Sequence, residues 1–204
     1  MAGKSSKTHI RTLEIDESLL DRIVQTTGVS RVVAHVFATR NLTDPESISR
    51  FMNPNLDTDW LDPHLIPGLS GVSARVVQAL KNGERIVIFG DYDLDGISAA
   101  ALLVRGLRAL GGDVEVVLPS RLEDGYGLSE TSIGYIEALK PQLVVTVDTG
   151  ISSRDEVGLL KARGIDVVIT DHHEPGDLIP LDVEVANPKL NTGYGVGQCH
   201  HGCG

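Results

Sequence analysis

The sequence predicts an α/β fold, in which a parallel β-sheet is flanked by helices and preceded by a small, mostly helical N-terminal segment. Short apolar runs rich in β-branched residues, such as 86–89 and 143–147, alternate with longer segments of helical periodicity. Glycines mark the ends of several of the helical segments. The apolar runs are nearly continuous, which is typical of parallel strands that are covered on both faces.

Short helices are expected in the N-terminal part of the chain. Apolar residues recur at helical spacing across 16–40, and Gly28 divides this stretch into two helices. Asp44 and Pro45 fit the cap and the first position of a third helix. Residues 51–71 are rich in proline and aspartate, so we expect an ordered connector there.

From residue 73 onward, predicted strands and helices alternate in a pattern typical of βαβ units. The expected elements are helix 73–81, strand 86–89, helix 96–110, strand 114–118, helix 129–139, strand 143–147, helix 152–163, strand 167–170 and strand 183–186. The domain division that follows is a helical segment with its connector at 1–72, the α/β domain at 73–190, and an irregular tail at 191–204.

Length, charge and cysteine content limit the class of protein. The 204 residues suffice for one large domain, or for one domain with a smaller unit. A net charge of −10 is unfavourable for a protein that binds nucleic acid by itself. No apolar run approaches the ~20 residues that span a bilayer, so we expect no membrane attachment. Only Cys199 and Cys203 are present, so the body has no disulfide framework and a reducing cytoplasm is expected.

Acidic and imidazole side chains follow three of the predicted strands. Residues beyond the carboxyl ends of parallel strands gather at one edge of the sheet, where functional groups collect. The side chains concerned are Asp91, Asp93 and Asp95 after the first strand, Asp148 after the third, and Asp171, His172 and His173 after the fourth. We therefore expect these residues to form one site.

Close carboxylates repel one another and lose hydration when partly buried, and a bound cation offsets both costs. The trio Asp91, Asp93 and Asp95 therefore points to a metal, although a turn with Asp95 as helix cap is the alternative for these residues alone. Asp148 by itself fits a cap or an Asx-turn better, but beside the trio we expect it to bridge two ions. The combination of aspartates with His172 favours Mn²⁺, Fe²⁺, Co²⁺ or Zn²⁺ over Ca²⁺.

Two further segments carry candidate groups. Arg121 offers a planar guanidinium that can clamp a phosphate, and its alternative role is a surface salt bridge with Glu123 or Asp124. The run 199–203 (CHHGC) resembles a metal knuckle, but it lies in a glycine-rich end, and we interpret it as a disordered tail.

These motifs resemble those of the DHH phosphoesterase superfamily. The matching segments are 90–96 (GDYDLDG), 147–150 (VDTG) and 171–173 (DHH). Segments 119–128, 146–153 and 170–176 together resemble the bacterial RecJ branch, which consists of single-strand-specific 5′→3′ DNA exonucleases, and 51–54 (FMNP) and 187–188 (NP) also resemble it. The resemblance extends over residues 20–190 and includes the order and spacing of the motifs.

The resemblance implies a phosphodiesterase with two metal ions, usually Mn²⁺, with Mg²⁺ as the other candidate. By position the metal ligands are Asp91 (in or beside the coordination shell), Asp93, Asp95, Asp148 and His172. Asp148 would bridge the ions, Asp171 would orient the histidines, and His173 would contact the scissile phosphate, which agrees with the phosphate contact that the residue type suggests for Arg121. Two such ions activate a water and stabilise the charge of an in-line displacement.

The resemblance also implies a longer protein. The family continues after residue 188 into a fourth motif with another metal-binding aspartate, a second catalytic lobe and an OB-type nucleic-acid-binding domain. The sequence after Tyr194 does not resemble that continuation. We therefore expect a truncated N-terminal portion that is incomplete as an enzyme and lacks the basic DNA-binding surfaces.

The resulting hypothesis is the catalytic lobe of a Mn²⁺-dependent exonuclease that digests single-stranded DNA from a 5′ end in recombination and DNA repair. A helicase or a single-strand-binding protein is the expected partner. One alternative is another DHH branch, such as an oligoribonuclease, a cyclic-dinucleotide phosphodiesterase or a pyrophosphatase, and segment 121–128 argues against it. A second is a non-catalytic DHH-like binding module, against which the intact acidic and histidine sets argue.

Overall fold

The computed structural model describes residues 13–119 and 127–190 of the chain. The chain divides into two compact units, with the boundary between Leu61 and Asp62. This boundary falls inside the connector that the sequence predicts at 51–71. Arg121 and the cysteine-containing tail lie outside the described residues.

The first unit is made of short helices with capped ends. They are α1 (Glu17–Thr27), α2 (Arg31–Thr39), α3 (Pro45–Met52) and α4 (Leu56–Asp59). Gly28 adopts φ +73° and ends α1, as the sequence predicts. The Asp44 carboxylate accepts a hydrogen bond from the Ser47 amide at 2.8 Å and caps α3, and Pro45 takes the first position. Leu20, Ile23 and their apolar neighbours form a core of this unit's own.

The second unit is the α/β domain. Its elements are the 3₁₀ helix η1 (Pro63–Leu65), α5 (Leu69–Asn82), β1 (Ile86–Gly90), α6 (Leu94–Ala109), β2 (Val114–Val117), α7 (Glu130–Ala138), β3 (Leu143–Val147), α8 (Arg154–Ala162), β4 (Asp166–Thr170) and β5 (Glu184–Ala186). Within the described residues, five strands form one sheet in the order β2-β1-β3-β4-β5, and every pairing is parallel. The predicted fold class is confirmed.

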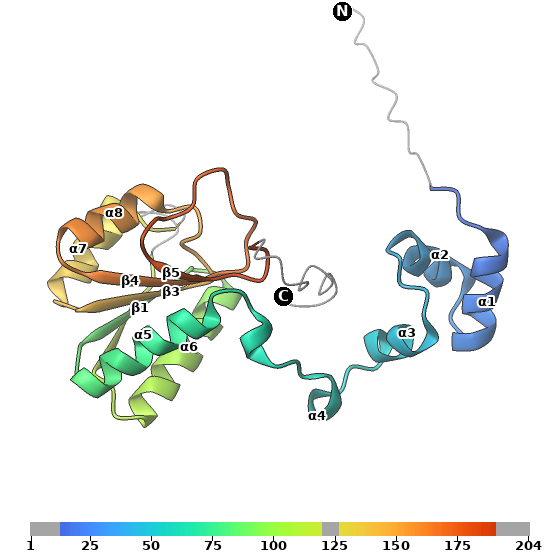
Figure 1. Ribbon diagram of the computed structural model, residues 1–204, viewed down its shortest axis with the longest axis horizontal. Helices are drawn as coiled ribbons and strands as arrows, with labels where there is room; N and C mark the ends of the chain where they lie inside the picture. The colour runs from blue at the N-terminus through green and yellow to red at the C-terminus, as the bar shows by residue number, and fades with distance from the viewer. Residues whose placement is uncertain (1–12, 120–126, 191–204) are drawn as a thin grey trace, which may run out of the picture. The chain divides into compact units, whose positions relative to one another are not determined.

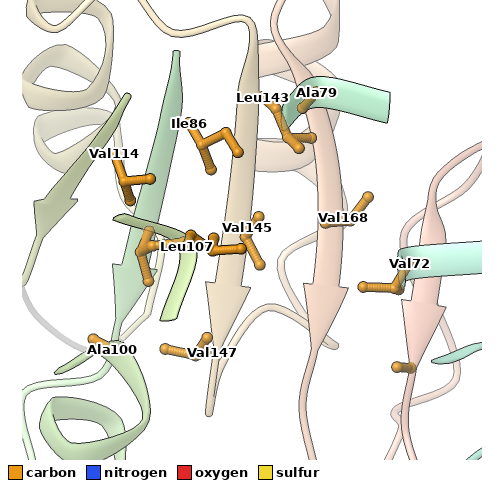
Figure 2. Packing of buried hydrophobic residues seen from close by; sticks show 12 residues of the cluster. Val72, Ala79, Ile86, Ala100, Leu107, Val114, Leu143, Val145, Val147 and Val168 are labelled. Carbon is orange, nitrogen blue, oxygen red and sulfur yellow. The ribbon is translucent and has the colours of Figure 1, made fainter. Parts of the chain in front are cut away.

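Helices cover both faces of the sheet, α5 and α6 on one side and α7 and α8 on the other (Figure 1). Alternate strand residues point to opposite faces, so each face has its own apolar layer. Ile86, Val145 and Leu107 belong to the layer beneath α5 and α6, part of which Figure 2 shows. Val87, Phe89 and their neighbours form the other layer. Burial on both faces explains why the strand sequences are continuously apolar.

The starts of three helices of the α/β domain differ from the sequence prediction by two residues or more, and one of them, α8, begins at Arg154 instead of residue 152. Helix α5 begins at Leu69 instead of residue 73, directly after Gly68, whose φ is +79°. A Cβ on Gly68 would lie 1.8 Å from the carbonyl oxygen of Val185, so only glycine fits this approach to β5. Helix α6 begins at Leu94 instead of residue 96.

The predicted connector also holds more secondary structure than expected. It includes the end of α3, all of α4 and η1, and the start of α5. Trp60, which lies in this segment, remains 74% exposed. None of the helices in the described part of the chain has both the length and the apolar character that crossing a bilayer requires.

Candidate metal centre

Three aspartates lie side by side at the carboxyl edge of the sheet because of strand register. Gly90 pairs with Val147 and Val147 pairs with Thr170, and these residues end the adjacent strands β1, β3 and β4. Asp91, Asp148 and Asp171 are the next residues along the chain. The sheet thus brings together the three clusters that the sequence predicts to converge.

The first cluster forms the junction between β1 and α6. Asp91 is buried, and its Oδ1 accepts a hydrogen bond from the Tyr92 amide at 2.7 Å. Asp93 caps α6, because its Oδ1 accepts from the amides of Asp95 at 2.9 Å and Gly96 at 3.0 Å. The alternative that Asp95 is the cap is therefore wrong. Asp95 lies in the first turn of the helix with its carboxylate half exposed.

Asp148 occupies a strained and buried position between the other clusters. Its φ is +59°, a left-handed conformation that aspartate tolerates better than most residues but that still costs about 1–3 kcal/mol. The side chain is 6% exposed, and Oδ1 lies 2.9 Å from His172 Nε2. Despite this distance, Oδ1 accepts no hydrogen bond from any described residue. Burial and the charges of Asp95 and Asp93 raise the pKa of Asp148, against the opposing effect of the histidines.

Asp171 holds the turn that carries the two histidines. Its Oδ1 accepts from the amides of His172 at 2.7 Å and His173 at 3.0 Å, and its Oδ2 accepts from the amide of Ile151 at 3.0 Å. The Nδ1 of His173 lies 2.7 Å from the same Oδ1. Burial alone would raise the pKa of Asp171, but these hydrogen bonds lower it.

The histidines differ in their surroundings. The Nε2 of His172 points toward two carboxylates, at 2.9 Å from Asp148 Oδ1 and 3.7 Å from Asp95 Oδ2. Burial would lower the pKa of His173, but the hydrogen bond with Asp171 and the nearby carboxylates outweigh it and raise this pKa. The two rings meet edge to face, with centroids 4.8 Å apart.

Two groups of donor atoms have the proximity that a metal ion requires. One consists of Asp148, His172 and His173, the other of Asp91, Asp93 and Asp148, and within each group the donor atoms lie within 4.8 Å of one another. Both groups contain Asp148, so its carboxylate is placed to be shared. A buried carboxylate oxygen without a hydrogen bond, facing oxygen and imidazole donors, fits a divalent transition metal such as Mn²⁺. Asp95 belongs to neither group.

The N-terminal domain of the DHH family matches residues 85–199 of this chain. The chain belongs to the DHH family. Within it, the chain is 44% identical over 163 residues to the single-stranded-DNA-specific exonuclease RecJ of Escherichia coli, covering 78% of this chain and 27% of that protein. It is 33% identical over 174 residues to RecJ of Bacillus subtilis, covering 85% of this chain and 22% of that protein.

Solved structures show the same similarity for this DHH chain. RecJ of Thermus thermophilus in complex with Mn²⁺ matches with a TM-score of 0.62 and 31% identity, over 89% of this chain and 25% of that one. A second exonuclease RecJ structure, bound to manganese, matches with a TM-score of 0.60 and 40% identity, over 65% of this chain and 34% of that one. The chain spans about a quarter of the length of the curated relatives above.

Sequence reasoning assigned no role to Asn187, which the structure places beside the site. Asn187 is fully buried, and its Nδ2 donates a hydrogen bond to the carbonyl oxygen of His173 at 3.0 Å. The available signal was an Asn-Pro pair directly after a short predicted strand, which does not indicate a contact with a particular residue.

Proposed function

We propose that this chain is the metal-binding lobe of a 5′→3′ exonuclease that hydrolyses single-stranded DNA in recombination and repair. The observation that carries the proposal is the pair of donor groups that share the buried carboxylate of Asp148. The relatives named as single-stranded-DNA-specific exonucleases and the RecJ structures with Mn²⁺ support it. The proposed compartment is the cytoplasm, and a helicase or a single-strand-binding protein is the proposed partner.

In this proposal Mn²⁺ is the cofactor, with Mg²⁺ as a substitute. The proposed ligands are Asp91, Asp93, Asp95, Asp148 and His172. When bound, two ions supply an activated water and neutralise charge on the phosphodiester. Asp171 holds the histidine turn, and His173 directs its ring at the scissile phosphate, where an imidazole N–H stabilises an oxygen of the transition state. Arg121, outside the described residues, is the proposed second phosphate contact.

Digestion of DNA tests the proposal directly. The full-length protein in which this lobe is proposed to act is incubated with Mn²⁺ and a 3′-labelled single-stranded oligonucleotide, with a blunt duplex of the same sequence for comparison. We expect stepwise loss from the 5′ end of the single strand and none after chelation. Preferential cleavage of short RNA, a cyclic dinucleotide or pyrophosphate would instead identify another activity of the DHH family.

Asp148→Asn tests the shared ligand. The change keeps the shape of the side chain but removes its charge, and we expect the loss of most Mn²⁺ binding and of activity. Even residues that only hydrogen-bond to metal ligands typically change metal affinity or activity roughly 10–100-fold when they are substituted. A loss of Mn²⁺ affinity and activity below about tenfold would therefore contradict a bridging role for Asp148. Metal content provides the second measurement. Two bound Mn²⁺ per chain would indicate that this chain holds a complete two-ion centre, and one or none would indicate an incomplete one.

A further inference from the structure

Asn187 is buried, and both the donor and the acceptor of its side-chain amide form hydrogen bonds within the protein. It follows β5 and is 0% exposed. Its Nδ2 donates to the carbonyl oxygen of His173 at 3.0 Å, and its Oδ1 accepts from the Lys189 amide at 2.8 Å. A buried amide with satisfied donor and acceptor fixes the segments that it joins, because breaking either bond leaves an unpaired polar group.

The histidine turn is therefore held from two sides. The carboxylate of Asp171 accepts from the backbone amides of His172 and His173, and the amide of Asn187 donates to the backbone carbonyl of His173. Together these bonds fix the peptide units on both sides of His173. The direction of a side chain depends on its backbone angles, so these three bonds also limit where the imidazole rings point.

Backbone hydrogen bonds hold Asn187 and Asp171 in place. The backbone N–H of Asn187 donates to the carbonyl oxygen of Pro67 at 3.2 Å, and the backbone N–H of Asp171 donates to the carbonyl oxygen of Ala186 at 3.0 Å. Next to Pro67, Gly68 approaches β5 so closely that no side chain fits. The end of β5 is thus tied both to the start of the histidine turn and to the segment before α5.

We propose that Asn187 is a positioning residue of the metal centre, which sets the direction of the His172 and His173 rings through the carbonyl of His173. The consequence for DNA cleavage rests on the proposed function. The consequence for metal affinity depends only on the donor group that contains the two histidines. Asn187 lies outside that group, so its effect passes through the turn that it holds.

The substitution Asn187→Asp removes the donated hydrogen bond and adds a negative charge at the same position. Aspartate has the same shape and keeps an oxygen for the Lys189 amide, but it places an oxygen in front of the His173 carbonyl. Mn²⁺ affinity is measured by the electron paramagnetic resonance signal of free Mn²⁺, and DNA cleavage is measured at saturating Mn²⁺. We expect about tenfold weaker Mn²⁺ binding and about tenfold lower kcat, the size typical of partners that orient metal ligands, while KM changes little.

Ser132→Ala is the matched control. Ser132 is equally buried, and its hydroxyl belongs to the capping box of α7. Removing this hydroxyl lowers the free energy of unfolding by about 1 kcal/mol. The hydroxyl makes no contact with the histidine turn, so we expect Mn²⁺ affinity to stay at the wild-type value. Wild-type Mn²⁺ affinity in Asn187→Asp, or an equal loss in both variants, would overturn the proposal.

Folding failure is also decisive. If Asn187→Asp does not fold, Asn187→Ser, which also removes the amide donor, is compared with Ser132→Ala in the same assays. If neither Asn187 variant folds while the control does, the residue is structural and the positioning role is wrong. If the wild-type chain binds Mn²⁺ but the full-length protein does not cleave DNA, the proposed exonuclease function fails, and the Mn²⁺ titration still decides the role of Asn187.

Discussion

At the scale of single residues, one carboxylate organises the candidate centre without belonging to either donor group. Asp171 accepts three backbone amides and faces the Nδ1 of His173. This number of donors explains why its pKa is lowered although the side chain is buried. The charge of Asp171 also favours a proton on the facing nitrogen, so the N–H proposed to contact the phosphate is the one on the other ring nitrogen of a protonated His173.

Asp171→Asn is expected to loosen the turn. An amide offers one acceptor oxygen where the carboxylate offers two, so at least one buried N–H loses its partner, at a cost of about 1–3 kcal/mol. Urea unfolding followed by circular dichroism gives the change in the free energy of unfolding. Asp113→Asn, which weakens a half-exposed salt bridge with Arg85, is the control, with an expected change below about 1 kcal/mol. Equal changes in the two variants would contradict the assigned role.

The sequence located the aspartates and histidines of the centre, because parallel strands present the residues that follow them at one edge. It did not settle which aspartate of the first cluster caps the helix that follows. Asp93 and Asp95 fit a helix cap equally well by residue type, and only the actual start of α6 selects Asp93. Asn187 was missed because its bond to His173 joins residues 14 positions apart across an irregular loop.

At the scale of elements, the junction between β1 and α6 shows how the backbone places the first carboxylates. A Cβ on Gly96 would lie 2.5 Å from both the nitrogen and the oxygen of Asp91, so the helix can start this close only with glycine. Alternating apolar and helical segments predicted the strands and helices of the sheet. They did not predict that β3 pairs with β1 in the interior while β2 lies at the edge, because strand order depends on long-range packing.

Helix α5 is tied to the sheet by an ion-pair network that should depend on pH. Arg75 Nη2 donates to Glu84 Oε2 at 2.7 Å, both side chains are 18% exposed, and Arg75 Nε also pairs with Asp166. Hydrogen bonds from Asn82 and Arg75 lower the pKa of Glu84. The folded state therefore binds a proton on Glu84 more weakly than the unfolded chain does. The stabilisation that ionised Glu84 gives is fully present above the pKa of glutamate in the unfolded chain, about 4.3. It is lost as the pH falls through the lower pKa of Glu84 in the folded state.

Glu84→Gln should therefore destabilise the protein most at neutral pH. We expect a loss of ~1 kcal/mol at pH 7 that shrinks as the pH falls below about 4, measured by urea unfolding across this range. Glu137→Gln provides the comparison, because Glu137 pairs with Arg163 at 2.9 Å but both side chains are about 40% exposed. Its effect should be smaller at every pH. A constant difference between wild type and Glu84→Gln over the whole range would refute the assignment.

At the scale of the whole molecule, the candidate centre belongs entirely to the unit that begins at Asp62, and the first unit has a separate apolar core. Ligand binding stabilises a folded unit in proportion to the logarithm of ligand concentration over its dissociation constant. The carboxylates of the centre also repel one another until a cation binds. Mn²⁺ should therefore stabilise the chain unevenly along its length.

Hydrogen exchange measured by mass spectrometry tests this expectation. At Mn²⁺ concentrations about 100 times the dissociation constant, peptides from 86–96, 143–150 and 167–173 should gain protection equivalent to up to ~2.7 kcal/mol. Peptides from 13–61 should exchange as they do without metal, because the first unit contributes none of the donor atoms that the structure groups together. Asp148→Asn should abolish the gain while leaving exchange in 13–61 unchanged. Equal protection in both units would show that Mn²⁺ acts on the chain as a whole and not through the shared carboxylate.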